Sequence, residues 1–400
     1  MFPAPRYCVQ AWKVPRPPYF ITNTTLTDTF DTGTFDTGTF DKQLEIDLGV
    51  AARLSEPPDG APRDALAADA RAVQPEDALG ALLRLIGSDM EACNRAIVAR
   101  MDSEVELIPQ LAAHIVAAGG KRLRPLLTLA SARLCGYAGD RHISLAACVE
   151  FIHTATLLHD DVVDESVLRR GLTSANAVFG NKASVLVGDF LFARAFQLMV
   201  ADGSLQVLGI LSHAAATIAE GEVLQLATQN DLSTTEARYL EVVRGKTAAL
   251  FAAACEVGGV VAARPDAEQH ALFDYGMNLG IAFQLVDDLL DYSADQAVLG
   301  KTVGDDFREG KVTLPVLIAY QTGGPAAQAF WKRTIEASDQ NDDDLSRALA
   351  LIAESGAMCG TLDRAATFAI AAQRALEIFP PSPLRTALHQ VADYTLSRAR

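Results

Sequence analysis

The sequence predicts an all-α protein, in which a single large helical bundle surrounds a deep central cavity. Three observations carry this prediction. Half of the 400 residues are apolar. From about residue 79 to residue 400, apolar residues recur every three or four positions among abundant Ala, Leu, Glu and Arg. No run in this region shows the strict alternation typical of a strand. Such a length of helix is enough for a sizeable core and an internal cavity.

Residues 1–78 differ in composition and are predicted to form a low-complexity or disordered extension. The segment Thr29–Asp41 repeats Thr-Phe-Asp-Thr-Gly with a period of five residues, far below the roughly 20 to 50 residues of repeats that stack into a fold. The stretch Glu56–Pro75 is rich in Pro, Ala and Asp. Neither can bury a core of its own. We interpret the extension as dispensable, with a docking segment as the alternative.

The same extension is where a signal for the cellular location of the protein would be expected. Arg6, Lys13 and Arg16 precede the first acidic residue, Asp28, as in a transit peptide. Five prolines within residues 1–27 would disrupt an amphipathic helix, and no continuous apolar stretch suits a secretory signal. A cytoplasmic location is therefore expected, with mitochondrial targeting as the alternative.

Charge and cysteine usage exclude several classes of protein. The formal net charge is −16, and the basic residues are scattered, so no nucleic-acid partner is expected. The longest uncharged stretch, Gly203–Ala219, contains polar residues and falls short of a membrane span. Without a basic amphipathic helix, we expect at most peripheral membrane contact. The six cysteines form no Cys-x-x-Cys pair and are expected to be small buried side chains in a reducing compartment.

Glycine-rich positions divide the helical region. We expect connections between helices at Gly119–Gly120, Gly136–Gly139, Gly171, Gly180–Asn181, Ala201–Gly203, Gly258–Gly259, Gly300, Gly310 and Gly323–Pro325. Residues Ser233–Glu236 have the form of a capping box, which predicts a helix that runs from there toward Arg244.

An acidic cluster interrupts the apolar helix that is expected from Leu145 onward. Asp160 and Asp164 are four residues apart, so they lie about 40° apart on one helix face, with Asp161 a further step round. Like charges placed in this way repel each other. The arrangement therefore predicts a bound cation.

A second acidic cluster has the same spacing. Asp287, Asp288 and Asp291 repeat the pattern Asp-Asp-x-x-Asp 127 positions later, again flanked by apolar helix. Carboxylates without a His or Cys ligand set favour hard cations, and Mg²⁺ commonly takes its remaining ligands from water and phosphate. The pair of clusters therefore predicts Mg²⁺ and a substrate that carries phosphate.

Basic residues in turn-like positions supply the complementary charges for a diphosphate. They occur in the segments Gly119–Pro125, Arg169–Gly171, Gly245–Thr247 and Gly300–Thr302. The last two contain Gly-Lys-Thr, which raises the alternative of a nucleotide-binding P-loop. That loop needs a glycine five residues before the Gly-Lys pair, where this sequence has Leu240 and Asp295. No strand is expected before either one, so nucleotide chemistry is disfavoured.

Taken together, these motifs make residues 79–400 resemble the trans-isoprenyl diphosphate synthases of the polyprenyl synthetase family, in particular its long-chain members. The resemblance implies the all-α isoprenoid synthase fold, in which two aspartate-rich motifs face each other across a cavity. It also implies a prenyltransferase that condenses isopentenyl diphosphate with an allylic diphosphate, and a homodimer.

The resemblance further implies individual roles. Six aspartates would hold Mg²⁺ against the allylic diphosphate, namely Asp160, Asp161, Asp164, Asp287, Asp288 and Asp291. Basic residues that would clamp the same diphosphate are Arg169, Lys246 and Lys301. Residues that would hold isopentenyl diphosphate are Lys121, Arg124, His153 and Arg170. Thr247 and Gln284 would face the allylic cation with oxygen dipoles. The departing diphosphate would take the final proton, so no protein base is required.

Product length is expected to depend on the helix that carries the first motif. Short-chain relatives place an aromatic plug where this sequence has Ala155 and Thr156, and Ile152 lies further back on the same helix. Each helical turn rises about 5.4 Å, so small residues over several turns could admit a long chain. The segment Gly221–Gln225 also departs from the short-chain pattern Gly-Gln-x-x-Asp. These features predict a long-chain product, and the resemblance implies an octaprenyl to decaprenyl chain, as used in the side chain of ubiquinone.

Three alternatives to this function stay open. One is a shorter-chain synthase that makes farnesyl or geranylgeranyl diphosphate. Another is a non-catalytic subunit of a heteromeric synthase, although both aspartate clusters are complete here. The third is a terpene cyclase, which would not need Lys121, Arg124 and Arg170 for isopentenyl diphosphate.

Overall fold

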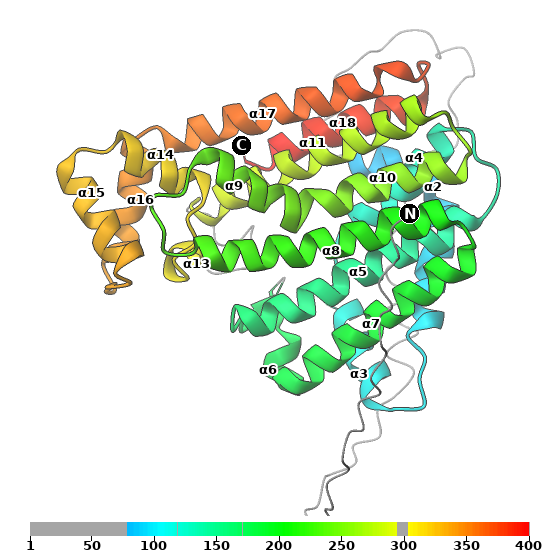
Figure 1. Cartoon of the computed structure of the whole chain (residues 1–400), viewed down its shortest axis with the longest axis horizontal. Coiled ribbons are helices and arrows are strands. Elements are labelled where there is room, and N and C mark those ends of the chain that lie inside the picture. The colour runs from blue at the N-terminus through cyan, green and yellow to red at the C-terminus, as the bar shows by residue number, and fades with distance from the viewer. Residues whose placement is uncertain (1–77, 118, 170, 294–302, 400) are drawn as a thin grey trace, which may run out of the picture. The chain divides into compact units, whose positions relative to one another are not determined.

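The computed structural model describes residues 78–117, 119–169, 171–293 and 303–399. Within these ranges the chain is almost entirely helical (Figure 1), which confirms the predicted all-α class. The exception is an antiparallel pair of short strands, β1 (Leu168–Arg169) and β2 (Leu172–Thr173). The predicted extension lies outside the described residues except for Ala78, and Arg170, Gly300, Lys301 and Thr302 lie outside them too.

The helices follow one another with short connections. The first part of the chain contains α2 (Ala78–Arg100), α3 (Leu107–Ala117), α4 (Leu123–Leu134), α5 (Arg141–Val163), α6 (Ala175–Phe179), α7 (Asn181–Asp202) and α8 (Leu205–Thr228). The middle part contains α9 (Glu236–Val243), a π-helical turn η2 (Arg244–Ala248), α10 (Ala249–Val261), α11 (Asp266–Asp291) and α13 (Asp305–Arg308). The last part contains α14 (Leu314–Thr322), α15 (Pro325–Trp331), η3 (Lys332–Glu336), α16 (Asp344–Glu354), α17 (Ala357–Ala375), η4 (Leu376–Ile378) and α18 (Pro383–Ser397).

Two local predictions need correction. The expected break at Gly258–Gly259 is absent, because α10 continues through both residues. A Cβ atom on Gly258 would lie 2.7 Å from the backbone nitrogen of Ala132, so this glycine allows close packing of α10 on α4. The helix expected after Ser233 begins later: the N-cap of α9 is Thr235, whose hydroxyl accepts a hydrogen bond from the backbone N–H of Arg238.

Helix α10 lies at the centre of the packing. It contacts α4, α5, α8 and α11, and nearly all of its side chains are buried. A helix that is apolar on all sides can be accommodated only inside a bundle. Because α5 and α11 carry the two aspartate clusters and both pack against α10, the centre of the bundle positions the two clusters (Figure 1).

Helices α7 and α8 each have one face on the bundle and another that is exposed. Apolar side chains on the exposed faces include Leu186, Phe196 and Val200 of α7, and Leu205 and Val223 of α8. By length and composition alone, both helices could cross a membrane, although the sequence analysis expected no such segment. Large unpartnered apolar surfaces of this kind mark interaction sites.

Candidate active site

The two aspartate clusters meet at one cavity of about 570 Å³. The first cluster stands at the C-terminal end of α5 and the second at the C-terminal end of α11. The wall of the cavity contains five aspartates of the two clusters: Asp160, Asp164, Asp287, Asp288 and Asp291. Two clusters 127 positions apart in the sequence therefore face the same space.

The aspartates of the first cluster differ in their surroundings. Oδ2 of Asp164 accepts a hydrogen bond of 3.0 Å from Nζ of Lys311. Burial raises the pKa of Asp160, an effect that the positive charge of Lys246 opposes and the negative charge of Asp164 reinforces. A further positive charge beside Asp160 would relieve the repulsion between the carboxylates of Asp160 and Asp164.

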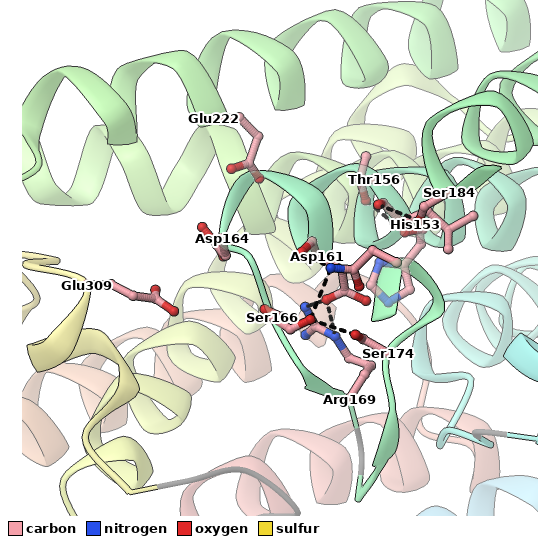
Figure 2. A network of polar contacts seen from close by, with 12 residues as sticks. His153, Thr156, Asp161, Asp164, Ser166, Arg169, Ser174, Ser184, Glu222 and Glu309 are labelled. Atoms are coloured by element: carbon pink, nitrogen blue, oxygen red, sulfur yellow. Dashed lines mark hydrogen bonds and ion pairs between the residues drawn. The ribbon is translucent and has the colours of Figure 1, made fainter. Parts of the chain in front are cut away.

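Asp161 points to a different side of α5 from Asp164. Figure 2 shows its carboxylate directed at the guanidinium of Arg169, whereas Asp164 lies toward Glu222 and Glu309. Nε of Arg169 donates to Oδ1 of Asp161 at 2.8 Å, and Nη2 donates to the same oxygen. Asp161 is buried and does not line the cavity. In this arrangement Asp161 holds Arg169, which does line the cavity, on the β1–β2 hairpin.

The second cluster is also differentiated. Oδ1 of Asp287 accepts a hydrogen bond of 2.6 Å from Nη2 of Arg398, near the end of the chain. Asp288 accepts hydrogen bonds from Gln284 and from the hydroxyl of Tyr239, and burial raises the pKa of Asp288 to about 7. Oδ2 of Asp291 accepts a bond from the backbone N–H of Asp306 at 3.1 Å.

The donor set at the cavity fits a hard cation. The acidic groups offer oxygen only, and no cysteine lies in the cavity wall. Within the described residues, no three His, Cys, Asp or Glu side chains converge closely enough to form a complete metal site. Carboxylate oxygens suit ions that take further ligands from water and a substrate phosphate.

Lys246 and Thr247 reach the cavity from the π-helical turn η2. Two glycines allow α8 to approach this turn closely, because a Cβ atom on Gly221 would lie 2.4 Å from the backbone nitrogen of Lys246 and 2.7 Å from the carbonyl carbon of Gly245. Oxygens of Glu222 and Gln225 on α8 then lie 2.7 Å from Nζ of Lys246. Burial raises the pKa of Glu222 to about 7, although the charge of Lys246 acts in the opposite direction.

Three of the four residues predicted for isopentenyl diphosphate line the same cavity, namely Lys121, Arg124 and His153, and the fourth, Arg170, lies outside the described residues. Nη1 of Arg124 is 3.1 Å from Nε2 of His153, and its guanidinium carbon lies 4.4 Å from the ring centre of Phe251. Nζ of Lys121 donates to the hydroxyl of Tyr394, from the C-terminal helix α18. Three side chains that could bind a phosphate thus line the cavity.

The residues predicted to limit product length lie in different surroundings. Thr156 lines the cavity, whereas Ala155 and Ile152 are fully buried in the apolar core. One further turn back, Sγ of Cys148 is 3.4 Å from the carbonyl oxygen of Ala195 in α7. The part of α5 that precedes Thr156 in the sequence, at Cys148, therefore packs against α7.

The sequence analysis missed several residues of the cavity wall. Lys311 follows a glycine, as do Lys246 and Lys121, and this local signal could have identified it. Glu222 and Gln225 were noticed only as a departure from a pattern. Tyr239 and Arg398 carry no local signal, because only the packing of α9 and of the chain end brings them to the second cluster.

A comparison with protein families matches the Polyprenyl synthetase family model to residues 105–352. Among characterised proteins, the octaprenyl diphosphate synthase of Escherichia coli K12 is 48% identical over 320 residues, which are 79% of this chain and 98% of that protein.

Solved structures agree with this similarity. A decaprenyl diphosphate synthase from Rhodobacter capsulatus is 54% identical, with a TM-score of 0.77 over 80% of this chain and 99% of the other. A polyprenyl synthase from Caulobacter crescentus CB15, crystallised with calcium and isoprenyl diphosphate, is also 54% identical, with a TM-score of 0.79 over 80% and 98% of the two chains.

Proposed function

Because this chain belongs to the polyprenyl synthetase family, we infer that it is an all-trans long-chain polyprenyl diphosphate synthase. It adds isopentenyl diphosphate repeatedly to an allylic diphosphate. The observation that carries this function is the single cavity in which both aspartate clusters face Lys121, Arg124 and His153. A terpene cyclase would have no use for that basic set.

The product length that we propose is octaprenyl to decaprenyl, suited to the side chain of ubiquinone. The relatives named above make octaprenyl and decaprenyl diphosphate, and their identity to this chain extends over about four fifths of its length. The shorter-chain alternative has no comparable support.

The metal that we propose is Mg²⁺. Asp160, Asp164, Asp287 and Asp291 line the cavity with carboxylate oxygens, and a relative was crystallised with calcium and isoprenyl diphosphate. When bound, Mg²⁺ would supply positive charge against the diphosphate that leaves. The protein would add the charges of Lys246 and Lys311, together with Arg169 held by Asp161 and the predicted Lys301.

The remaining side chains would act on the reacting carbon and the second substrate. Lys121, Arg124 and His153, with the predicted Arg170, would orient isopentenyl diphosphate. Thr247 and Gln284 would present oxygen dipoles to the allylic cation, which is the kind of preorganised electrostatic stabilisation that commonly dominates catalysis. The released diphosphate would accept the proton that the new double bond loses.

We also propose a homodimer that forms through α7 and α8. Leu186, Val200, Leu205 and Val223 expose apolar surface there, and covering such a surface with a second copy removes it from water. The enzyme would work in the cytoplasm, with at most peripheral contact with a membrane and without nucleic acid.

One experiment tests the function directly. The full-length protein would be incubated with labelled isopentenyl diphosphate, an allylic primer and Mg²⁺, and products would be measured by mass spectrometry. Octaprenyl to decaprenyl products are expected. Farnesyl or geranylgeranyl products would support the shorter-chain alternative. No incorporation by the protein alone, but incorporation after another subunit is added, would indicate a heteromeric synthase.

A further inference from the structure

A chain of hydrogen bonds links four side chains along one wall of the cavity. Oγ1 of Thr247 donates to Oε1 of Gln284 at 2.7 Å. Nε2 of Gln284 donates to Oδ1 of Asp288 at 2.7 Å. The hydroxyl of Tyr239 donates to Oδ2 of Asp288 at 2.5 Å. The chain thus joins η2, α11 and α9, and all four residues line the cavity.

The direction of this chain follows from Asp288. Burial raises the pKa of Asp288, but the hydrogen bonds from Tyr239 and Gln284 act in the opposite direction and favour its ionised form. An ionised carboxylate only accepts hydrogen bonds, so with this form the end of the Gln284 amide that faces it is the N–H donor. The amide oxygen then faces Thr247, whose hydroxyl donates to it. A reversed amide would place oxygen against the carboxylate and N–H against the reacting carbon. Because Tyr239, Thr247 and Asp288 are buried, water could not readily compensate for that reversal.

Each oxygen of Asp288 accepts one of these hydrogen bonds, and the residue is only 5% exposed. Its neighbour Asp287 has 38% of its side chain exposed. The adjacent carboxylates therefore differ in what they can offer to a metal ion. Asp287 can exchange its partner Arg398 for a cation, whereas a cation at Asp288 would compete with the Tyr239 hydroxyl and the Gln284 amide for a buried carboxylate.

We propose that Tyr239 and Asp288 are a positioning pair that fixes the amide of Gln284 with its oxygen toward Thr247 and the allylic cation. The inference rests on the proposed function and deepens it: Asp288 acts through Gln284 and is not a metal ligand. The pair lowers the barrier because a fixed oxygen dipole stabilises the cation, and a freely rotating amide would lose part of that stabilisation.

Tyr239→Phe tests the pair, because it removes the hydroxyl and keeps the buried ring. We expect kcat of the first condensation to fall about tenfold, the size of effect from losing one hydrogen bond to a charged group. KM for isopentenyl diphosphate should change by less than about twofold, since this substrate binds elsewhere in the cavity.

Tyr275→Phe is the matched control. Tyr275 is also fully buried, and its hydroxyl donates to the carbonyl oxygen of Leu388 at 2.9 Å, away from the cavity wall. It should show a similar change in melting temperature and an unchanged kcat. If both Tyr→Phe variants keep the wild-type kcat, the positioning role is wrong.

A second comparison separates positioning from metal binding without relying on turnover. The melting temperature of each variant would be measured with inorganic diphosphate as Mg²⁺ is added. Asp288→Asn should keep the Mg²⁺ concentration that gives half of the stabilisation, while its kcat falls. Asp287→Asn should raise that concentration at least about tenfold. Equal shifts in the two variants would overturn the proposal.

The outcomes also separate this inference from the proposed function. If the wild-type protein forms no prenyl product, the proposed function fails. If the wild-type protein is active while Tyr239→Phe matches Tyr275→Phe in kcat, only the positioning pair fails.

Discussion

Adjacent aspartates of the two clusters have different surroundings, although the sequence presents them as equivalent. Asp160 and Asp161 are neighbours, yet one lines the cavity and the other holds Arg169. Asp287 and Asp288 show the same division, with partners at Arg398 and Gln284. Consecutive residues on a helix point in directions that differ by about 100°. Two adjacent aspartates therefore cannot both direct their carboxylates at the same ligand position.

Asp160→Ala is expected to remove Mg²⁺-dependent turnover and leave the fold intact. Asp160 is placed where burial and Asp164 both disfavour its charge, which a bound cation would relieve. Incorporation of labelled isopentenyl diphosphate and circular dichroism would measure the two effects. Retained turnover would contradict a metal-binding role.

The pKa of Glu222 predicts how stability depends on pH. Burial raises this pKa to about 7 from 4.5, so the folded metal-free protein binds the proton more tightly than the unfolded chain does. Its contribution to stability is complete at low pH and declines as the pH rises from about 4.5 to about 7, by at most about 3 kcal/mol.

Glu222→Gln should remove this decline. The melting temperature of the wild-type protein should therefore fall relative to that of the variant as the pH rises through this window. Glu220→Gln, at an exposed position on the same helix, serves as the control. A constant difference between wild type and Glu222→Gln would show that the carboxyl does not titrate there.

We expect product length to depend on side chains along α5. Thr156 lines the cavity and Ala155 is buried. Thr156→Tyr should shorten the main product without reducing the first condensation, because the ring occupies space that a growing chain needs. Ala155→Tyr should also shorten the product, and overpacking of the core should cost about 1 to 3 kcal/mol of stability.

Mass spectrometry of products and thermal melts would distinguish these two variants. Products of wild-type length from both would mean that the chain grows along a different wall. The site of the length limit would then have to be sought on another helix.

At the scale of elements, the close contact of α8 with η2 positions Lys246. Gly221→Ala would place a methyl group 2.4 Å from the backbone nitrogen of Lys246. Helix α8 and η2 must then separate, so Glu222 and Gln225 lose their hydrogen bonds from the ammonium group of Lys246. We expect both the melting temperature and kcat to fall, with kcat down by about tenfold or more.

Gly209→Ala is the matched control on α8, because nothing lies within 4 Å of the added Cβ atom. Alanine favours a helix over glycine by about 1 kcal/mol, so this variant should keep its activity and gain some stability. Equal behaviour of the two variants would show that the contact of α8 with η2 has no special role.

At the scale of the whole molecule, the exposed faces of α7 and α8 predict self-association. The combined variant Leu186→Glu and Val200→Glu should convert the proposed dimer to a monomer, since buried unpaired charges oppose association. Ile370→Glu, at an exposed apolar position on α17, should leave the dimer unchanged. Sedimentation measurements give the masses, and a monomeric wild-type protein would contradict the interface.

Much of this protein could be predicted from local patterns. The spacing of apolar residues predicted the helical class, and the repeated spacing identified six aspartates, at 160, 161, 164, 287, 288 and 291, of which all but Asp161 line the cavity. These features are local because helix geometry relates residues three and four positions apart. Gly258–Gly259 misled the prediction, since a glycine can permit close packing as well as end a helix.

The sequence by itself determined the helical class, the two carboxylate clusters and the basic residues that complement them. The tertiary structure alone decided which aspartates face the cavity, and that Tyr239, Arg398, Glu222 and Gln225 hold the groups around them. The physical reason is that a helix determines the spacing of its own side chains, whereas a hydrogen bond between helices depends on how closely and at what rotation they pack.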